Sequence, residues 1–321
     1  MILSLILCAQ ALATLLINIS NKVDLAECST NYINIFLLLG VSSLSGLTIP
    51  GLFPGTKQVV LFSEPSHYAI ALTPLLFTSL CISSRLKIFN FIQVICLIVL
   101  CFFLESVTLA AIVLLASLAH YVMQYKQASE RILRRNFAST IILVILGIAT
   151  IYLVTQNQYF LERLNFINID LDDTASLSSN VSLAMGYQEA YLNLLKSHFL
   201  GLGFQQMGIC LPTGSFANAI HIVNGGYTNR YDGSILASKI VSEFGLAGVF
   251  LIVAYLSYCL KIIRTSSSNN LSSVQRLSIG LIISLVPYLF VRGGGYFGGP
   301  VLISLAGLLV FEYKENKTIH C

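Results

Sequence analysis

The chain has 321 residues, of which 56% are hydrophobic and 10% are charged, and its mean hydropathy is +0.81. A soluble domain of this composition would expose too much apolar surface to water, so we expect a polytopic membrane protein. The formal net charge of +4 largely reflects basic residues in the loops between apolar segments. No basic stripe with interleaved aromatic residues is present, so we expect no nucleic-acid partner.

Nine apolar segments are each close to the roughly 20 residues that a helix needs to cross a bilayer. The predicted fold is therefore all-α, a single membrane domain over residues 1–321. Most lysines and arginines fall on one side of this threading, which we assign as cytoplasmic. The predicted spans are 2–18, 31–48, 68–84, 88–104, 107–124, 138–154, 236–260, 277–291 and 298–313.

The largest hydrophilic insertion covers residues 155–235 and is predicted to be a periplasmic loop within the membrane domain. Apolar residues recur at helical spacing over 184–200, which predicts a helix that stops at Gly201. Residues 170–173 read D-L-D-D, and we interpret this acidic run as a solvated loop rather than a metal site.

The eight cysteines give no reason to expect structural disulfides, because most lie in apolar spans and none forms a C-x-x-C pair. We therefore expect no disulfide framework and no bound metal.

Several ionisable residues gather at the predicted outer ends of the spans. Residues 63–67 read S-E-P-S-H and open the third span. Proline at the first helical position makes Glu64 the predicted N-cap, and His67 lies three residues later on the same face. A carboxylate beside an imidazole can raise its basicity, as a general base requires. The alternative is a capped helix with an interfacial histidine.

A second group of residues suggests an anion site at the same interface. Arg230 and Asp232 precede the seventh span, and Arg292 is followed by Gly293, Gly294 and a third glycine. Arginine binds phosphate oxygens with two parallel hydrogen bonds, and consecutive glycines let backbone amides approach an anion. These features predict a diphosphate site, and the alternatives are a snorkelling arginine and a tight turn.

Lys239 and Glu243 lie one turn apart in the seventh predicted span. We expect them to form an i,i+4 ion pair, which lowers the cost of burying both charges.

Four elements, in this order, resemble elements of the bacterial O-antigen polymerase family. Residues 62–67 (F-S-E-P-S-H) resemble its E-P-S-(H) element, and residues 197–204 (S-H-F-L-G-L-G-F) resemble its P-L-x-G-x-G element. Residues 232–248 resemble the element that re-enters the membrane, and residues 292–297 (R-G-G-G-Y-F) resemble the late R-G-x-x-Y-F element. Two departures are Phe199 in place of proline and Lys57 where the family has arginine.

The resemblance implies a C-type membrane glycosyltransferase in the bacterial inner membrane, multi-pass, with its active site facing the periplasm. Its substrate would be an oligosaccharide repeat unit linked to undecaprenyl diphosphate. The bond to the diphosphate already holds the energy for transfer, so no cofactor is expected. Partners would be this lipid-linked substrate and the bilayer, with a chain-length regulator as a candidate protein partner.

Combining the resemblance with the charges gives two sets of candidate site residues. The candidate catalytic residues are Glu64, His67 and Asp232. The candidate diphosphate ligands are Lys57, Arg230, Arg292, Gly293, Gly294 and Tyr296.

Two other functions remain as alternatives. An O-antigen ligase shares the large loop, but ligases usually carry a His-Asn pair where this chain has Asp232 and Gly233. A flippase or other transporter would place charges near the bilayer midplane and show repeat symmetry, and neither is seen in the sequence.

Overall fold

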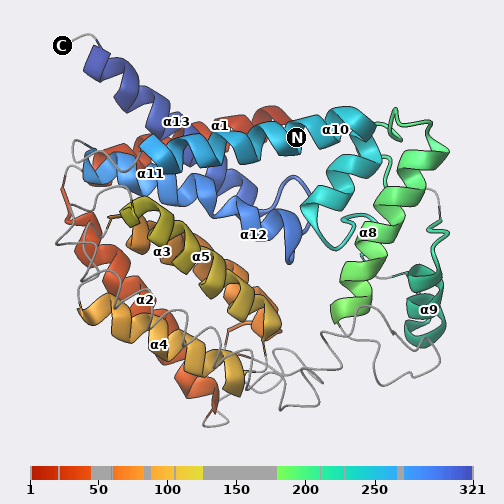
Figure 1. Ribbon diagram of the computed structural model, residues 1–321, viewed down its shortest axis with the longest axis horizontal. Helices are drawn as coiled ribbons and strands as arrows, with labels where there is room; N and C mark the ends of the chain where they lie inside the picture. The colour runs from red at the N-terminus through yellow and green to blue at the C-terminus, as the bar shows by residue number, and fades with distance from the viewer. Residues whose placement is uncertain are drawn as a thin grey trace. The chain divides into compact units, whose positions relative to one another are not determined.

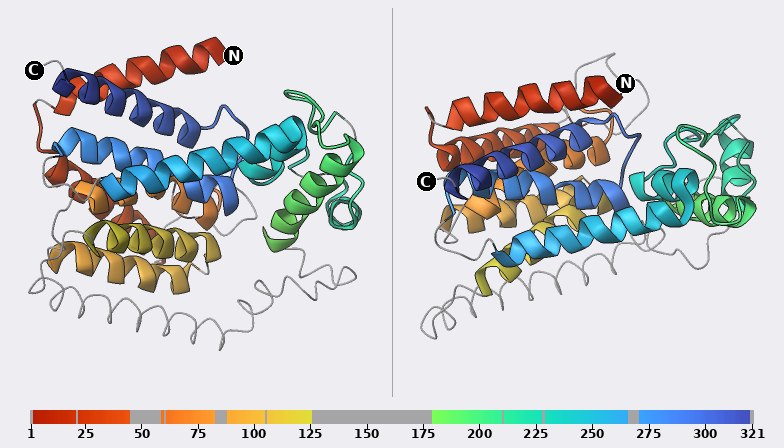
Figure 2. Two further views of the ribbon diagram at one scale, coloured as in Figure 1. Left: turned by 45° about the horizontal axis from the view of Figure 1, so that its top comes forward. Right: turned by 90° about the horizontal axis from the view of Figure 1, so that it is seen from above.

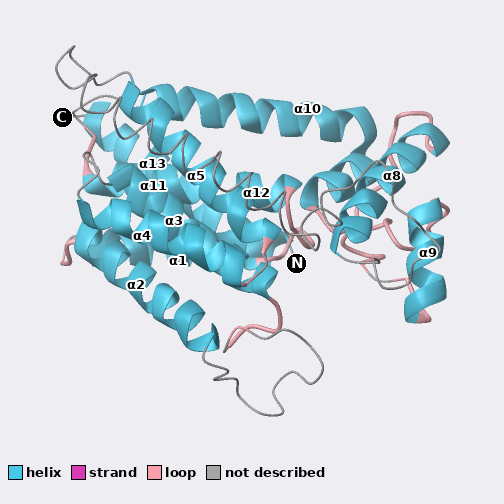
Figure 3. Cartoon of the chain, turned by 60° about the horizontal axis from the view of Figure 1, so that its bottom comes forward, coloured by secondary structure: helices cyan, strands magenta, loops and turns pink. Residues whose placement is uncertain are grey.

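The computed structural model describes residues 2–20, 22–44, 59, 61–82, 88–104, 106–125, 179–209, 211–227, 229–265 and 271–319. These residues form helices and connecting turns, and the only strand-like pairing among them is an isolated bridge between Val59 and Phe62 (Figure 3). The chain divides into two compact units. The first comprises Met1–Ile148, Cys259–Pro287 and Gly299–Cys321, and the second comprises Ala149–Tyr258 and Tyr288–Gly298.

The first unit is a helical bundle built around α3. Helix α3 packs against α2, α5 and α11, while α13 packs against α1 and α11, and α4 packs against α2 and α5 (Figures 1 and 2). Short helix α12 (Leu285–Phe290) runs from this unit into the second. The helices of the bundle are α1 (Ile2–Ser20), α2 (Leu25–Leu44), α3 (Pro65–Ile82), α4 (Ile88–Phe103), α5 (Val107–Tyr125), α11 (Ser273–Ile283) and α13 (Gly299–Ile319).

Small residues and polar contacts bring the helices of the bundle close together. A Cβ added at Gly280 of α11 would lie 2.5 Å from the Cα of Thr78 in α3, so this crossing requires glycine. The hydroxyl of Tyr68 donates to the carbonyl of Phe36, 2.8 Å away. Apolar packing alone discriminates poorly between helices in lipid, so such contacts help to select helix pairs.

The composition predicts apolar helices that suit a membrane, and this prediction is confirmed for the described part of the chain. Four helices in the described part of the chain are long and apolar enough to cross a bilayer, namely Ile2–Ser20, Pro65–Ile82, Leu236–Arg264 and Ser273–Phe290. Shorter apolar helices occupy Ile92–Phe103, Val107–His120 and Gly299–Tyr313. The nine-span threading and its orientation remain predictions, and the predicted span 138–154 and the acidic run 170–173 lie outside the described residues.

Two helix starts differ from the predicted boundaries because polar residues cap them. Helix α2 begins at Leu25 rather than at residue 31, since the Asp24 carboxylate accepts a hydrogen bond from the amide of Glu27 at 3.4 Å. Helix α11 begins at Ser273 rather than at residue 277, since Ser272 and Gln275 form a capping box. Such polar residues lower the local hydropathy, so the predicted spans begin later than the helices do.

The second unit contains α8 (Ser179–Lys196), α9 (Ser215–Asn224) and most of α10 (Leu236–Thr265). Helix α8 coincides with the helix predicted over 184–200, but it ends at Lys196 rather than at Gly201. His198 and Phe199 have positive φ values of 50° and 69°, so the chain leaves the helix before the glycine is reached.

Helix α9 packs against α8. A side chain of α8 also accepts hydrogen bonds from backbone amides at the N-terminal end of α9. The Glu189 carboxylate accepts hydrogen bonds from the amides of Thr213 (3.1 Å) and Gly214 (2.7 Å). A carboxylate from a neighbouring helix therefore replaces the side-chain cap that Gly214 cannot supply.

Candidate functional site

A buried ion pair lies at the centre of the second unit. The ammonium of Lys239 is 2.9 Å from the Glu243 carboxylate, and the two side chains are 3% and 0% exposed. The predicted i,i+4 ion pair on α10 is confirmed. Two charges removed from water require further hydrogen bonds to offset the cost of burial.

Those hydrogen bonds come from segments far away in the sequence. The Tyr296 hydroxyl donates to the Glu243 carboxylate at 2.9 Å, and the amides of Gln205 (2.9 Å) and Met207 (3.2 Å) do the same. Lys239 also donates to the carbonyl of Tyr231 at 2.6 Å. We call Lys239, Glu243 and Tyr296 the Glu243 cluster, which ties α10 to the 203–209 loop and to the turn after α12.

Aromatic rings enclose one side of the Glu243 cluster. The Tyr296 ring stacks on Phe204, with centroids 5.6 Å apart and planes 20° apart, and the Lys239 ammonium lies 5.2 Å from its centroid. Burial raises the pKa of the Tyr296 phenol above its ordinary value of 10.0, and the adjacent Glu243 carboxylate raises it further. Tyr296 therefore remains a neutral hydrogen-bond donor.

The loop of residues 197–204 forms backbone hydrogen bonds with α10 where this helix is interrupted. Gly245 has φ 58° and ψ −134°, which interrupts the helix. The carbonyls of Ser242 and Glu243 accept from the amides of Leu202 and Gly203, both at 2.9 Å, and the amide of Leu246 donates to Phe199 at 2.9 Å. The loop thus supplies hydrogen bonds that the continuous helix would have made with itself.

Two glycines make this backbone crossing possible. A Cβ at Gly245 would lie 2.1 Å from the carbonyl oxygen of Phe199, and a Cβ at Gly201 would lie 2.4 Å from that of Glu243. Both glycines also have positive φ. Neither position can accept a side chain without moving the backbone of its partner.

The glycines after Arg292 pack against the start of α10. The amide of Gly293 donates to the carbonyl of Ser234 at 3.0 Å, so this N–H is already used within the protein. A Cβ at Gly293 would lie 2.7 Å from the amide nitrogen of Leu236, so close packing alone requires glycine here. Gly294 lies near the Tyr288 hydroxyl, and Arg292 is half-buried in the same turn.

Arg230 holds the 203–209 loop. Its Nε donates to the carbonyl of Gly208, and its Nη2 donates to that of Ile209 at 2.9 Å. Its guanidinium also lies 5.3 Å from the centroid of the Tyr231 ring. Two N–H groups of Arg230 therefore bind backbone carbonyls. This gives the residue a structural role in addition to the predicted diphosphate contact.

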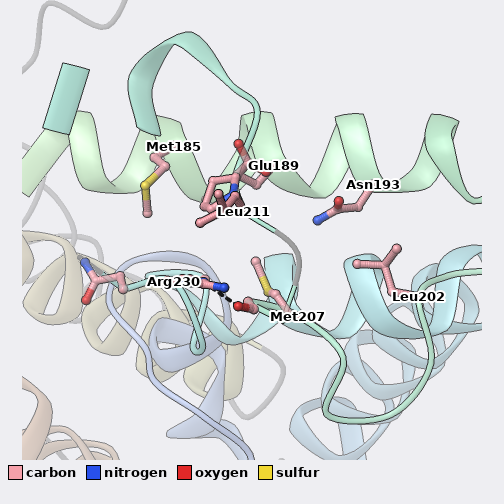
Figure 4. A pocket seen from close by; sticks show the side chains of 12 residues that line it. Met185, Glu189, Asn193, Leu202, Met207, Leu211 and Arg230 are labelled. Carbon is pink, nitrogen blue, oxygen red and sulfur yellow. Dashed lines mark hydrogen bonds between the residues drawn. The ribbon is translucent and has the colours of Figure 1, made fainter. Parts of the chain in front are cut away.

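A small pocket lies beside Arg230 (Figure 4). Met185, Glu189 and Asn193 project into it from α8, facing Met207 and Arg230. Its cavity volume of about 20 Å³ is close to what one water molecule needs.

Asp232 lies in the turn that precedes α10. Its carboxylate accepts a hydrogen bond from the Ser234 amide at 3.1 Å, and Ser234 has a positive φ of 66°. Within the described part of the chain, the Ser234 hydroxyl is buried and has no hydrogen-bond partner. A buried hydroxyl without a partner costs about 1–3 kcal/mol, which a bound oxygen atom can recover.

The Glu64 and His67 pair lies in the first unit, at the start of α3. Helix α3 begins at Pro65, directly after Glu64, so the predicted helix start is confirmed. The His67 ring is exposed, and its Nδ1 lies 2.7 Å from the Ser63 hydroxyl. The Ser66 hydroxyl donates to the Glu64 carboxylate at 2.9 Å. The proposed base therefore has polar neighbours within its own helical turn.

The candidate residues thus fall in two places. Arg230, Asp232, Arg292, Gly293, Gly294 and Tyr296 all belong to the second unit, and Glu64 and His67 belong to the first. Lys57 lies outside the described residues. Over the described ranges, no group of three or more His, Cys, Asp or Glu side chains could hold a metal ion.

Sequence reasoning identified the ion pair but missed its other partners. Tyr296 was predicted to bind a diphosphate, whereas its hydroxyl is directed to Glu243 in the structure. The amides of Gln205 and Met207 carry no side-chain signal, so their role could not be read from residue types. The one available clue was that residues 242–248 and 292–297 resemble two elements of one family.

Comparison with known proteins does not assign the chain to a family. No family model matches it. No curated protein and no solved structure matches it either.

Proposed function

We propose that this protein is a membrane glycosyltransferase that polymerises undecaprenyl-diphosphate-linked oligosaccharide repeat units at the periplasmic face of the bacterial inner membrane. The observation that carries the proposal is the interlocking of three elements that resemble polymerase elements. Residues 197–204, 232–248 and 292–297 are far apart in sequence, yet they meet through Glu243, Tyr296 and Gly293. Their hydrogen bonds to one another within the second unit support treating the three matches as parts of one site.

In the proposed reaction, the terminal hydroxyl of one repeat unit attacks the anomeric carbon at the reducing end of another chain. The new glycosidic bond forms as the bond from that carbon to the diphosphate breaks. Undecaprenyl diphosphate leaves with the bonding electron pair, and a general base takes the hydroxyl proton. Glu64 with His67 is the first candidate for this base, and Asp232 is the second.

Cationic groups would stabilise the charge that develops on the leaving diphosphate. Arg292 and Arg230 are the candidates in the second unit, and the guanidinium of Arg230 also holds two backbone carbonyls. Lys57 is a further candidate cation. Tyr296 and Gly293 would act by positioning the turn that carries Arg292, since their polar groups are bonded to Glu243 and Ser234.

The Ser234 hydroxyl beside Asp232 is buried and has no hydrogen-bond partner among the described residues, and an ordered water oxygen would satisfy it. The bilayer would present the polyprenyl tail of the substrate. A chain-length regulator protein would be a further partner in the cell.

Purified protein in vesicles with lipid-linked repeat units tests the proposal. We expect a ladder of lengthening glycans and release of undecaprenyl diphosphate, with a loss of about 10²–10³-fold for Arg292→Ala. Transfer only to an added lipid A core acceptor would instead indicate a ligase. Movement of the intact lipid-linked unit across the bilayer without new glycosidic bonds would indicate a transporter, and either result would overturn the proposal.

A further inference from the structure

The second unit exposes two large apolar side chains at the end of a clamped loop. Phe199 is 46% exposed and Leu200 is 82% exposed, and we call these two residues the apolar tip. Phe199 has a positive φ of 69°, which costs an L-residue about 1–2 kcal/mol. Backbone hydrogen bonds hold this conformation, since the amide of Phe199 donates to the carbonyl of Leu194 at 2.8 Å, while both side chains remain on the surface.

The apolar tip is fixed beside the membrane-spanning stretch of α10. The carbonyl of Phe199 accepts from the amide of Leu246, and Gly201 crosses the helix at Gly245. From this point, α10 presents a series of exposed apolar side chains, among them Leu246 at 58% and Phe250 at 72%. Residues Leu236–Arg264 form a helix long and apolar enough to cross a bilayer.

The surface of the apolar tip therefore continues the surface that α10 offers to lipid. With a rise of about 1.5 Å per residue, Phe250 lies roughly 6 Å further along the helix axis than Leu246. The tip is thus level with the first turn of the exposed apolar stretch rather than with its centre. Such a level corresponds to the boundary between headgroups and acyl chains.

Charges next to the apolar tip suit the same location. Lys196 and His198 are exposed and precede or flank Phe199 in the sequence. A lysine at a membrane boundary extends its ammonium toward the headgroup phosphates while its methylene stem remains in apolar surroundings. A protein partner with an apolar socket would not need this basic edge.

We propose that the apolar tip is embedded in the bilayer beside α10, in contact with lipid acyl chains. The loop 197–204 is then a membrane-anchored element rather than part of a free periplasmic loop. Because α10, the Glu243 cluster and this loop are bonded together, the anchor holds the candidate site of the second unit at the membrane surface. This inference concerns lipid contact and does not depend on the proposed glycosyl transfer.

The absence of tryptophan from the sequence allows a direct test in the full chain. Leu200→Trp and Ile222→Trp each create a single-tryptophan protein at almost equally exposed positions, 82% and 81%. Ile222 lies on α9, which packs on α8, and serves as the matched control. Phe250→Trp, within the spanning stretch of α10, serves as the positive control.

Each variant is reconstituted in phosphatidylcholine vesicles with and without bromine on the acyl chains, and tryptophan fluorescence is compared. We expect brominated lipid to quench Leu200→Trp by more than about half of the quenching seen for Phe250→Trp, and to leave Ile222→Trp almost unchanged. Emission should also shift to shorter wavelength for Leu200→Trp.

Quenching of Leu200→Trp no greater than that of Ile222→Trp would overturn the proposal. A shift to shorter wavelength without bromine quenching would also overturn it, because it would place the tip against protein. Phe199→Trp repeats the measurement if Leu200→Trp does not fold, as judged by its helical circular dichroism. Activity is not needed for the measurement, so failure of this inference is distinguishable from failure of the proposed function.

Discussion

Two glutamates at the ends of apolar helical segments have very different surroundings. The side chain of Glu243 is 0% exposed and receives donors from Lys239, Tyr296 and the 203–209 loop. Glu64 is half-buried at the start of α3, and its carboxylate accepts from Ser66 within the same turn. A charge at the edge of an apolar segment can therefore organise distant segments or remain accessible at a helix end.

This difference separates structural roles from chemical ones. A buried, fully hydrogen-bonded carboxylate has no room for an incoming hydroxyl, so Glu243 is expected to govern stability. A half-buried carboxylate next to an exposed imidazole can meet a substrate, so Glu64 and His67 are expected to govern rate.

The largest effect on stability is expected for Glu243→Leu. Removing one partner of a buried ion pair costs about 3–5 kcal/mol, because the other charge remains without its partner. The free energy of unfolding in detergent, followed by circular dichroism, measures the loss. Adding Lys239→Met should recover part of it but not all, since the amides of Gln205 and Met207 still lack an acceptor. Full recovery would mean that the ion pair alone matters.

An intermediate effect is expected at the break in α10. Gly245→Ala places a Cβ against the backbone of the loop, whereas Gly225→Ala has a similar positive φ and no atom within 4 Å. The control should lose about 1–2 kcal/mol of unfolding free energy from backbone strain alone. Gly245→Ala should lose about 1–3 kcal/mol more, from the clash and from its ψ of −134°, which lies outside the left-handed region that Gly225 occupies with ψ 11°. Equal losses at the two positions would show that the loop does not need this crossing.

A smaller effect is expected for Tyr296→Phe, which keeps the ring on Phe204 and removes the hydroxyl. One lost hydrogen bond to a carboxylate should cost about 1.5–3 kcal/mol at neutral pH. The raised pKa of Tyr296 means that its stabilisation is fully present below about pH 10 and is lost as the pH rises beyond it, because the unfolded phenol ionises first. The stability difference between wild type and variant should therefore shrink above about pH 10. A difference independent of pH would contradict the assigned hydrogen bond.

The smallest effect on stability is expected at the start of α3. His67→Ala should change the free energy of unfolding by no more than about 0.5 kcal/mol, because the ring is exposed. Glu64→Gln keeps an oxygen that can cap the helix, so it too should be mild. The same unfolding measurement decides this, and a loss comparable to that of Glu243→Leu would assign the helix end a structural role.

Sequence reasoning reached the parts of the molecule that depend on local composition. Helical class, most helix positions, the start of α3 after Glu64 and the ion pair of Lys239 with Glu243 follow from hydropathy and from spacing within one helix. The partners of Glu243 could not be predicted in this way, because Gln205 and Met207 contribute backbone amides. The break at Gly245 was also missed, since a single glycine in a hydrophobic helix gives no indication of the loop that will bond to it.

The same limit applies to the hydrogen bond of Tyr296. Its position in a glycine-rich turn next to Arg292 predicted a ligand for an anion, and only the folded chain shows its hydroxyl directed to Glu243. Arg230 differs in a similar way, because its guanidinium holds the carbonyls of Gly208 and Ile209. Residue type identifies a group that can bind charge, whereas the surrounding backbone decides what it binds.

The most direct test of the separation between structure and chemistry is the rate of glycan elongation by purified Glu64→Gln, His67→Ala and double-variant proteins in vesicles. Loss of a general base typically costs about 10²–10⁴ in rate, and members of one catalytic unit are not additive. We predict that both single variants and the double variant lose activity by similar factors while their unfolding free energies stay near that of the wild type. Near-normal elongation by both single variants, with loss of elongation by Asp232→Asn, would contradict this account and assign the base to the second unit.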